Sequence, residues 1–414
     1  MLVQPRGVRV KKIGIRALTC FVDSDNLDRA CGLLNRVGII EEEGYNIRTK
    51  RVSLIDNNFD DEKIREISEE MATNGIWGFS ASFDNPNDEN QINTARTILK
   101  QTENGFVNFN MRNDVGIDSN YVNSIEELIR ENSKDDSGIN NFRLGISFGL
   151  LEPTPFFPYS HHHSEGFSIG LEYVNLIMEV INQNSRNSLS DVQREISRVL
   201  EEEIRKIGDI GKTIEKETEM EFIGVDLSLA PYPYPLEDQS VVEIIETLGN
   251  IAKSRGDLDF RFGMSGTLFL HTFITQIIKR IASSPEIRTT GFNGIMYSVL
   301  EDSRLSNRFS RNDVSTNLLL LTSTTCGCGI DMVPMTDKGS AKAIAGMIWD
   351  IYALSRVLEK PLGLRVLPVP NSRAGDFTDF KHLFFSNTRL QDTRGGISYH
   401  DLPSQKTKSR IEIN

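Results

Sequence analysis

The sequence has few cysteines and no long apolar run. Only four of its 414 residues are cysteine, namely Cys20, Cys31, Cys326 and Cys328, which is too sparse for a disulfide framework. We therefore expect a reducing compartment and a cytoplasmic location. No apolar run reaches the roughly 20 residues that a membrane-spanning helix needs. The segment from Met1 to Lys12 also lacks the uninterrupted apolar core of a signal peptide.

Basic residues are in deficit as well. The chain has 46 Lys and Arg against 58 Asp and Glu, and its formal net charge is -12. Because binding to a phosphate backbone requires clustered cations, we expect no nucleic-acid partner, and no membrane partner either. With 38% hydrophobic residues the chain can bury a sizeable core. No long linker and no internal repeat divides it, so we predict one domain over residues 1–402 and a loose, polar, basic tail over residues 403–414.

Strand-like segments alternate with amphipathic helical ones. About ten strands are predicted, at residues 8–22, 46–55, 76–83, 104–111, 142–149, 166–174, 220–230, 294–300, 318–325 and 364–370. The clearest helices start with capping patterns at Ser190 and Ser240, or carry apolar residues on one face over 344–354. This alternation predicts an α/β fold with mostly parallel strands, either a barrel or an open doubly wound sheet. In both, the active site is expected at the carboxyl ends of the strands.

One predicted strand alternates polar and apolar side chains, which places Asp226 and Ser228 on the same face. In a sheet covered on both faces, such polar groups must be hydrogen-bonded or must contact a ligand, since an unpaired carboxylate there is costly. A ligand-orienting pair and a buried Asp satisfied by backbone amides are the two interpretations.

A second candidate is the segment around Cys326, which precedes a glycine. We expect an irregular turn here, and because glycine lets its backbone approach a ligand, this thiol suits a nucleophile or a radical role. Asp331 nearby joins it as a candidate catalytic residue. The alternatives are a small buried hydrophobic side chain or half of a metal site.

A third candidate is the run of three histidines from His161 to His163, followed by Glu165. Imidazole and carboxylate are metal ligands or proton-transfer groups, so His161 and Glu165 are candidate metal ligands. The alternative is a polar surface loop.

Glycine-containing segments near the end supply candidate substrate-binding residues. Arginine beside flexible backbone suits a carboxylate or phosphate, or else forms an ordinary turn with a salt bridge. The candidates are Arg373, Asp376, Arg394, Gly395 and Gly396.

Residues 225–231 and 326–332, with Gly375-Asp376 and Arg394-Gly395-Gly396, resemble the family called domain of unknown function 711. The resemblance spans nearly the whole chain and implies a barrel similar to that of pyruvate formate-lyase. Glycyl-radical enzymes of that fold carry an Arg-Val-x-Gly-Tyr type of loop, and this chain departs from it. Shared fold is also not shared chemistry.

The function predicted from the sequence is therefore a non-radical enzyme that acts on a small anionic metabolite. A non-catalytic metabolite-binding or regulatory protein is the first alternative. A metal-dependent enzyme that uses His161 and Glu165 is the second. The cofactor stays unknown, and a homo-oligomer stays open.

Overall fold

The structure is a computed structural model that describes residues 13–112, 116–134, 137–233, 238–253, 256–326 and 328–392, apart from the Cys326 side chain. The predicted tail over 403–414 and the candidates Arg394, Gly395 and Gly396 lie outside this part of the chain.

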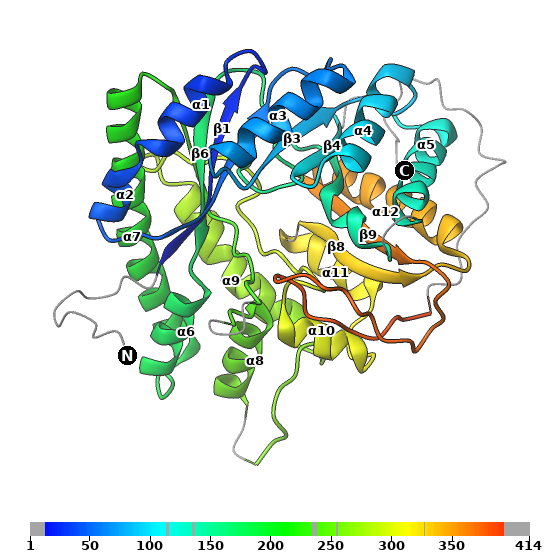
Figure 1. Cartoon of the computed structure of the whole chain (residues 1–414). Helices are drawn as coiled ribbons and strands as arrows, with labels where there is room; N and C mark the ends of the chain where they lie inside the picture. Colours follow the sequence, from blue (N-terminus) through cyan, green and yellow to red (C-terminus); the bar gives the residue numbers. More distant parts are fainter. Residues whose placement is uncertain are drawn as a thin grey trace, which may run out of the picture.

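The first part of the chain forms five neighbouring parallel strands (Figure 1). They are β1 (Gly14–Val22), β2 (Ile47–Leu54), β3 (Gly78–Phe83), β4 (Gly105–Met111) and β5 (Leu144–Phe148). The connecting helices are α1 (Leu27–Asn35), α2 (Gly38–Glu42), α3 (Asp61–Thr73), α4 (Glu89–Gln101), α5 (Ser119–Ser133) and the short 3-10 helix η1 (Ile139–Arg143). Asp60, Asp88 and Asp118 cap α3, α4 and α5 by accepting bonds from backbone amides of the first turn.

The second part adds four strands that run the other way. They are β6 (Gly166–Glu172), β7 (Phe222–Asp226), β8 (Gly329–Thr336) and β9 (Leu362–Val369). β6 is antiparallel to β1 and parallel to β7, and β9 is antiparallel to β5 and parallel to β8. The result is a nine-stranded, mostly parallel sheet with the order β7-β6-β1-β2-β3-β4-β5-β9-β8.

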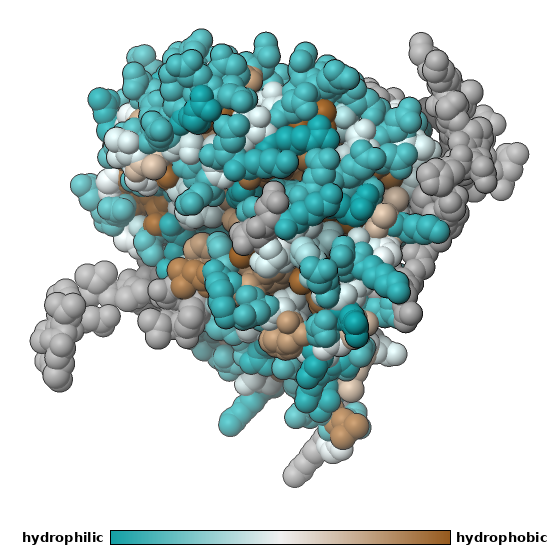
Figure 2. Space-filling model, turned by 45° about the vertical axis from the view of Figure 1, so that its right-hand side comes forward, coloured by the Kyte–Doolittle hydropathy of each residue, from teal (hydrophilic) through white to brown (hydrophobic). Residues whose placement is uncertain are grey.

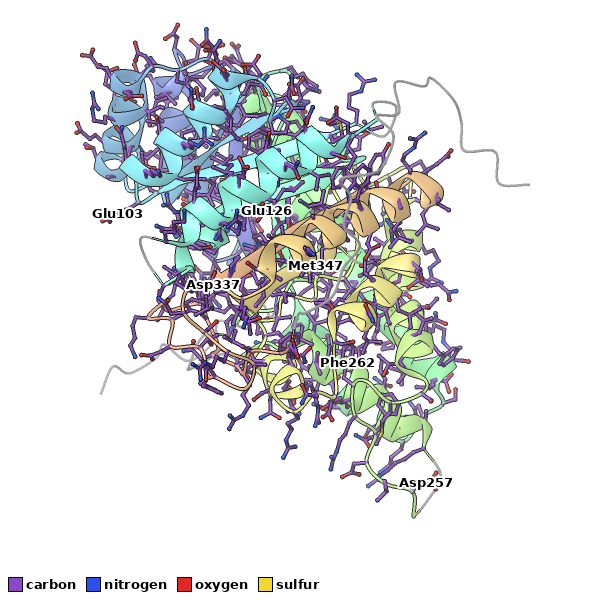
Figure 3. The ribbon with its side chains drawn as sticks, turned by 90° about the vertical axis from the view of Figure 1, so that its right-hand side faces the viewer. Glu103, Glu126, Asp257, Phe262, Asp337 and Met347 are labelled. Carbon is purple, nitrogen blue, oxygen red and sulfur yellow. The ribbon has the colours of Figure 1, made fainter. Side chains whose placement is uncertain are left out.

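The remaining helices are α6 (Val174–Gln183), α7 (Leu189–Thr218), α8 (Val241–Ala252), α9 (Thr267–Ala282), α10 (Ser303–Ser310), α11 (Thr316–Cys326) and α12 (Ser340–Leu358). In Figure 3, α5, labelled at Glu126, and α12, labelled at Met347, lie side by side. The space-filling face in Figure 2 is mostly hydrophilic and shows hydrophobic side chains only in small groups.

The predicted barrel is not established by these strands. Over the described residues the nine-stranded ladder has two free edges, at β7 and β8. The predicted strand 294–300 is not a strand of the ladder. Its neighbourhood instead forms three isolated parallel bridges, which are Val225–Thr289, Leu229–Ile295 and Ser298–Asp331. The segment 289–298 therefore contacts both β7 and the edge strand β8.

Two further predictions were wrong. Residues 318–325 form the helix α11, because a short apolar run such as Leu318 to Leu321 fits a helix and a buried strand equally well. The residues after Cys326, expected as an irregular turn, instead form strand β8. The other predicted strands each overlap an observed one. Helix α7 begins earlier than expected, with Ser188 rather than Ser190 as its cap, whereas Ser240 caps α8 as predicted.

A loop between β5 and β6 lies across the sheet. We call residues 153–161, which are buried, the inner loop. The side chains of Thr19 on β1 and Ser80 on β3 donate to its carbonyls. Inward-facing glycines make room for its rings, as at Gly363 on β9, where a Cβ would lie 2.6 Å from Tyr159 Cζ. The sheet and this loop are therefore fitted to one another.

Replacing Gly363 by Ala is expected to lower the free energy of unfolding by about 1–3 kcal/mol, because the added methyl group overpacks against Tyr159. Chemical denaturation measures this change. A methyl group added at Gly32 on α1 would meet nothing within 4 Å, so Gly32→Ala is the matched control and should raise stability by about 0.5–1 kcal/mol. Equal effects of the two changes would contradict this packing argument.

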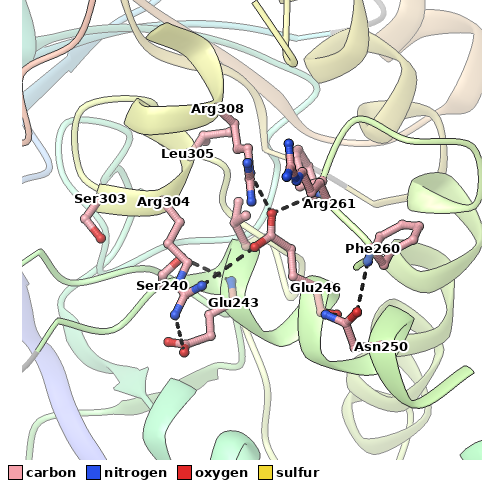
Figure 4. Close-up of polar contacts among 12 residues, drawn as sticks. Ser240, Glu243, Glu246, Asn250, Phe260, Arg261, Ser303, Arg304, Leu305 and Arg308 are labelled. Atoms are coloured by element: carbon pink, nitrogen blue, oxygen red, sulfur yellow. Dashed lines mark hydrogen bonds and ion pairs between the residues drawn. The ribbon is translucent and has the colours of Figure 1, made fainter. Parts of the chain in front are cut away.

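Buried carboxylates join α8 to α10. Asp302 accepts from Ser240 Oγ and from the backbone amides of residues 241 and 242, and it also caps α10. Glu246 accepts from Arg308 Nε at 2.7 Å and lies 3.7 Å from Arg304 Nη1 (Figure 4). These bonds attach helix α10, which follows the segment 289–298 in the chain, to helix α8.

Candidate functional site

The inner loop borders a cavity of about 890 Å³, a volume that includes open solvent. Its walls combine cations with aromatic rings. Four arginines line it together with two carboxylates, and these are Arg16, Arg48, Arg51, Arg365, Glu301 and Asp331. The aromatic part includes Trp77, Phe157, Tyr159, Tyr232 and His382. A concave, partly apolar space with a few convergent charges is the usual form of a small-molecule site.

The cavity does not lie where the sequence rule placed it. Arg16 is near the start of β1, Arg48 is near the start of β2, and Trp77 directly precedes β3, so the first five strands present their amino ends. The rule about carboxyl ends assumes strands that run one way. Here β6 and β9 are antiparallel to their neighbours, so carboxyl ends such as Glu172 of β6 lie beside amino ends such as Gly14 of β1.

Arg365 is the centre of a buried ion-pair network. Its Nε lies 2.6 Å from Asp331 Oδ1, and its Nη2 lies 2.7 Å from Asp331 Oδ2 and 3.1 Å from Glu301 Oε2. Tyr159 donates to Asp331 Oδ1 at 3.2 Å. Burial alone would lower the pKa of Arg365, but Asp331 and Glu301 outweigh it and raise that pKa well above its ordinary value. This arginine is therefore fully engaged by protein carboxylates.

Arg16 and Arg48 share a different carboxylate. Glu172 lies 3.0 Å from Arg48 Nη2 and 3.7 Å from Arg16 Nη1, and it accepts a further bond from Gln239 at 2.7 Å. Both guanidinium groups lie over the ring of Tyr232, at 4.5 Å and 4.9 Å from its centroid. Cation–π contact and ion pairing together hold the two arginines in place.

Arg51 differs from the other buried arginines. Its side chain is buried, yet it forms no ion pair with any described carboxylate within 4.0 Å. It donates to Thr49 Oγ1 at 2.8 Å and, more weakly, to the Pro155 carbonyl at 3.4 Å. Burial, with a further contribution from Arg16, lowers the pKa of Arg51 to about 9. Arg143, by contrast, is also buried but donates to several backbone carbonyls.

The predicted pair Asp226 and Ser228 does meet, but away from the cavity walls. Ser228 Oγ donates to Asp226 Oδ1 at 2.6 Å, and Thr154 Oγ1 donates to Oδ2 at 2.7 Å. The backbone amides of Ser228, Phe292 and Asn293 also donate to this carboxylate. This is the geometry of a buried Asp satisfied by amides, and it joins the inner loop, β7 and the segment 289–298.

The candidate metal ligands lie in separate environments. His161 is buried, with Nδ1 at 3.4 Å from the Tyr159 carbonyl oxygen. Glu165 forms an ion pair with Arg29 and accepts from Asn26 at 2.7 Å. Within the described ranges, no group of three or more His, Cys, Asp and Glu side chains is placed to hold a metal ion.

His161 predicts a pH dependence of stability. Burial lowers its pKa from 6.5 to about 4. Between these values the unfolded chain binds a proton that the folded chain rejects, so stability is complete above pH 6.5 and falls as the pH drops toward 4. The loss attributable to His161 is up to about 3 kcal/mol. Denaturation at pH 7 and pH 4.5 measures it, and His161→Gln should flatten this part of the profile. An unchanged slope in that variant would contradict the assignment.

The other predicted residues are placed as follows. Cys326 is the last residue of α11, and its side chain lies outside the described atoms. Cys328 is buried and lines the cavity. Asp331 lines the cavity as well. Arg373 and Asp376 are exposed and form a turn in which the Arg373 amide donates to Asp376 Oδ2 at 2.8 Å.

Sequence reasoning missed the arginines of β1 and β2. Their signal was present, because Arg48 and Arg51 lie within a predicted strand whose faces were both expected to be covered. Charged residues are almost never buried in such a place without a partner. The rule that places sites at the carboxyl ends of strands does not point to arginines inside a strand.

None of the described helices combines the length and apolar character that a bilayer crossing requires.

Relatives were found in bacteria and archaea. A UPF0210 protein of Carboxydothermus hydrogenoformans is 26% identical over 77% of this chain and 70% of its own length. A UPF0210 protein of Sulfurisphaera tokodaii is 27% identical over 91% and 88%. One from Pyrobaculum aerophilum is 26% identical over 58% and 52%. The family model described as "Uncharacterised ACR (DUF711)" matches residues 8–381, and the chain therefore belongs to that family.

Proposed function

We propose that this protein is an enzyme that acts on a small anionic metabolite, which binds in the arginine-lined cavity. The observation that carries the proposal is Arg51, a buried guanidinium that faces a cavity and forms no ion pair with a described carboxylate. A buried charge without a counter-ion is costly, so such a group is retained where a ligand supplies the opposite charge. Arg51 takes the role that the sequence gave to Arg373, because Arg373 is exposed and does not line the cavity.

His382 supplies the proton-transfer group in this proposal. It lines the cavity, and burial lowers its pKa below 6.5, so the ring is neutral at pH 7. The Phe384 amide donates to His382 Nδ1 at 3.3 Å, which assigns the ring proton to Nε2. A neutral imidazole with a fixed tautomer suits general acid–base chemistry. Cys328 lines the same cavity, so in this proposal it replaces Cys326 as the candidate catalytic thiol.

The test is native mass spectrometry of the full chain purified anaerobically, followed by incubation of any released ligand with fresh protein. We expect a small anion that copurifies with the native chain, is lost in Arg51→Gln and is retained in Arg36→Gln, where an exposed arginine changes. Conversion of the ligand by the native chain, and not by His382→Gln, supports an enzyme. A ligand that is held and never converted supports the alternative of a non-catalytic binding protein. A cavity that binds no anion would contradict both.

The metal-dependent alternative is tested on the same samples by elemental analysis. Glu165 is already engaged by Arg29 and Asn26, which weighs against this alternative. A stoichiometric metal that is lost in His161→Gln would favour it over the arginine site.

The barrel implied by the family resemblance also remains a proposal. We infer that the segment 289–298 acts as a further strand between β7 and β8, giving about ten strands in all. Its parallel bridges to both edges support this closure. A closed sheet would also explain why the inner loop is buried, since the interior of a small barrel is filled by side chains.

A further inference from the structure

Most of the arginines around the cavity are paired with carboxylates. Four lining arginines face three carboxylates, of which Glu301 and Asp331 line the cavity and Glu172 pairs with Arg16 and Arg48. His382 is neutral at pH 7 because burial lowers its pKa. Among these four arginines, Arg51 is the one that forms no ion pair with a described carboxylate. A ligand with one carboxylate would supply the missing counter-ion of this guanidinium.

Arg51 is held in a fixed orientation. Its guanidinium carbon lies 4.6 Å from the Trp77 ring centroid and 5.0 Å from that of Phe157. Nε is used by Thr49, and Nη1 makes only the long contact to Pro155. The edge of the guanidinium group formed by Nη1 and Nη2 is thus left for a ligand. The spacing of these two nitrogens matches the two oxygens of a carboxylate.

The rest of the wall is apolar. Beyond the charged groups the ligand would face the rings of Phe106, Phe142 and Phe384, with Met296 and Ala230. The hydroxyl groups of the lining belong to Thr49, Tyr159, Tyr232 and Ser298, and that of Tyr159 already donates to Asp331. Such a wall favours a hydrocarbon or aromatic body over a sugar or a polyol, because polar ligand groups would lose their hydrogen bonds to water.

We propose that the ligand of this cavity is an organic acid with one carboxylate and an apolar body, best an aromatic ring. The carboxylate lies against the Arg51 fork, and the body lies among the phenylalanine rings. This inference rests on the proposed function, and it narrows the anion to one chemical class.

The experiment is isothermal titration of the full chain with three probes: phenylacetate, its neutral analogue phenylacetamide, and inorganic phosphate. We expect phenylacetate to bind at least ten-fold more tightly than either of the others, because only it has both the single charge and the ring. In Arg51→Gln this preference should be lost, whereas Arg36→Gln should keep it.

The outcomes separate the two proposals. Tighter binding of phosphate, with loss in Arg51→Gln, would overturn the monocarboxylate inference and leave the anion site standing. Binding of neither anion would overturn both. Arg51→Lys guards against a folding defect, since it keeps the charge and loses only the fork. It should retain weakened phenylacetate binding, and equal affinity in Arg51→Gln and the native chain would overturn the role of Arg51.

Discussion

Replacing Arg51 by Met is expected to abolish anion binding and, at the same time, to stabilise the ligand-free protein. The guanidinium is buried and forms no ion pair with a described carboxylate, so in the free protein its desolvation is poorly compensated. Methionine reaches about as far as Nε of Arg51, so its flexible side chain fills part of the space beside Trp77 and Phe157. The lost bond to Thr49 offsets part of the gain. We expect a net rise in the free energy of unfolding of about 1–2 kcal/mol.

Chemical denaturation and ligand titration of the same variant measure the two effects. Arg143→Met is the matched control, because Arg143 is also a buried arginine but donates to the carbonyls of Leu99, Thr102 and Gly105. Its loss leaves those buried acceptors without their donor, and we expect a fall in stability of about 2–4 kcal/mol. A large fall in stability for Arg51→Met would show that Arg51 is structural, and would remove the main support for an anion site.

Replacing Asp226 by Ala is expected to lower the free energy of unfolding by about 3–5 kcal/mol. The carboxylate accepts from two hydroxyl groups and three backbone amides, all in a buried region. Without it, those amides are buried and unsatisfied, and the contact between β7, the inner loop and the segment 289–298 is lost. Asp226→Asn should cost less, since its amide oxygen still accepts from Ser228.

Denaturant midpoints of the two variants test this expectation, with ligand affinity measured on protein that has folded. We expect affinity to stay within about three-fold of the native chain in Asp226→Asn, because Asp226 does not line the cavity. Unchanged stability with complete loss of binding would return Asp226 to the ligand-orienting role that its sequence pattern first suggested.

Three segments show where a local sequence pattern is sufficient to predict structure and where it is not. The alternating pattern around Asp226 predicted that Asp226 and Ser228 share a face, and their side chains are hydrogen-bonded, although β7 ends at Asp226 and Ser228 lies beyond it. The leucine run at 318–321 was misread as a strand, because an apolar run without periodicity does not distinguish a buried strand from a helix. Strand β8 was missed because its sequence contains Gly329, Asp331 and Pro334, which are residue types that disfavour a strand prediction.

The sequence by itself determined the alternation of strands and helices, most element positions and the family, since these depend on local periodicity, capping residues and motifs. Only the tertiary structure decided the direction of β6 and β9, and with it the edge of the sheet at which the cavity lies. It also decided which of the cavity arginines form ion pairs with carboxylates. Arg16, Arg51 and Arg365 come from distant parts of the chain, and the balance of charge among them depends on distances that no local pattern encodes.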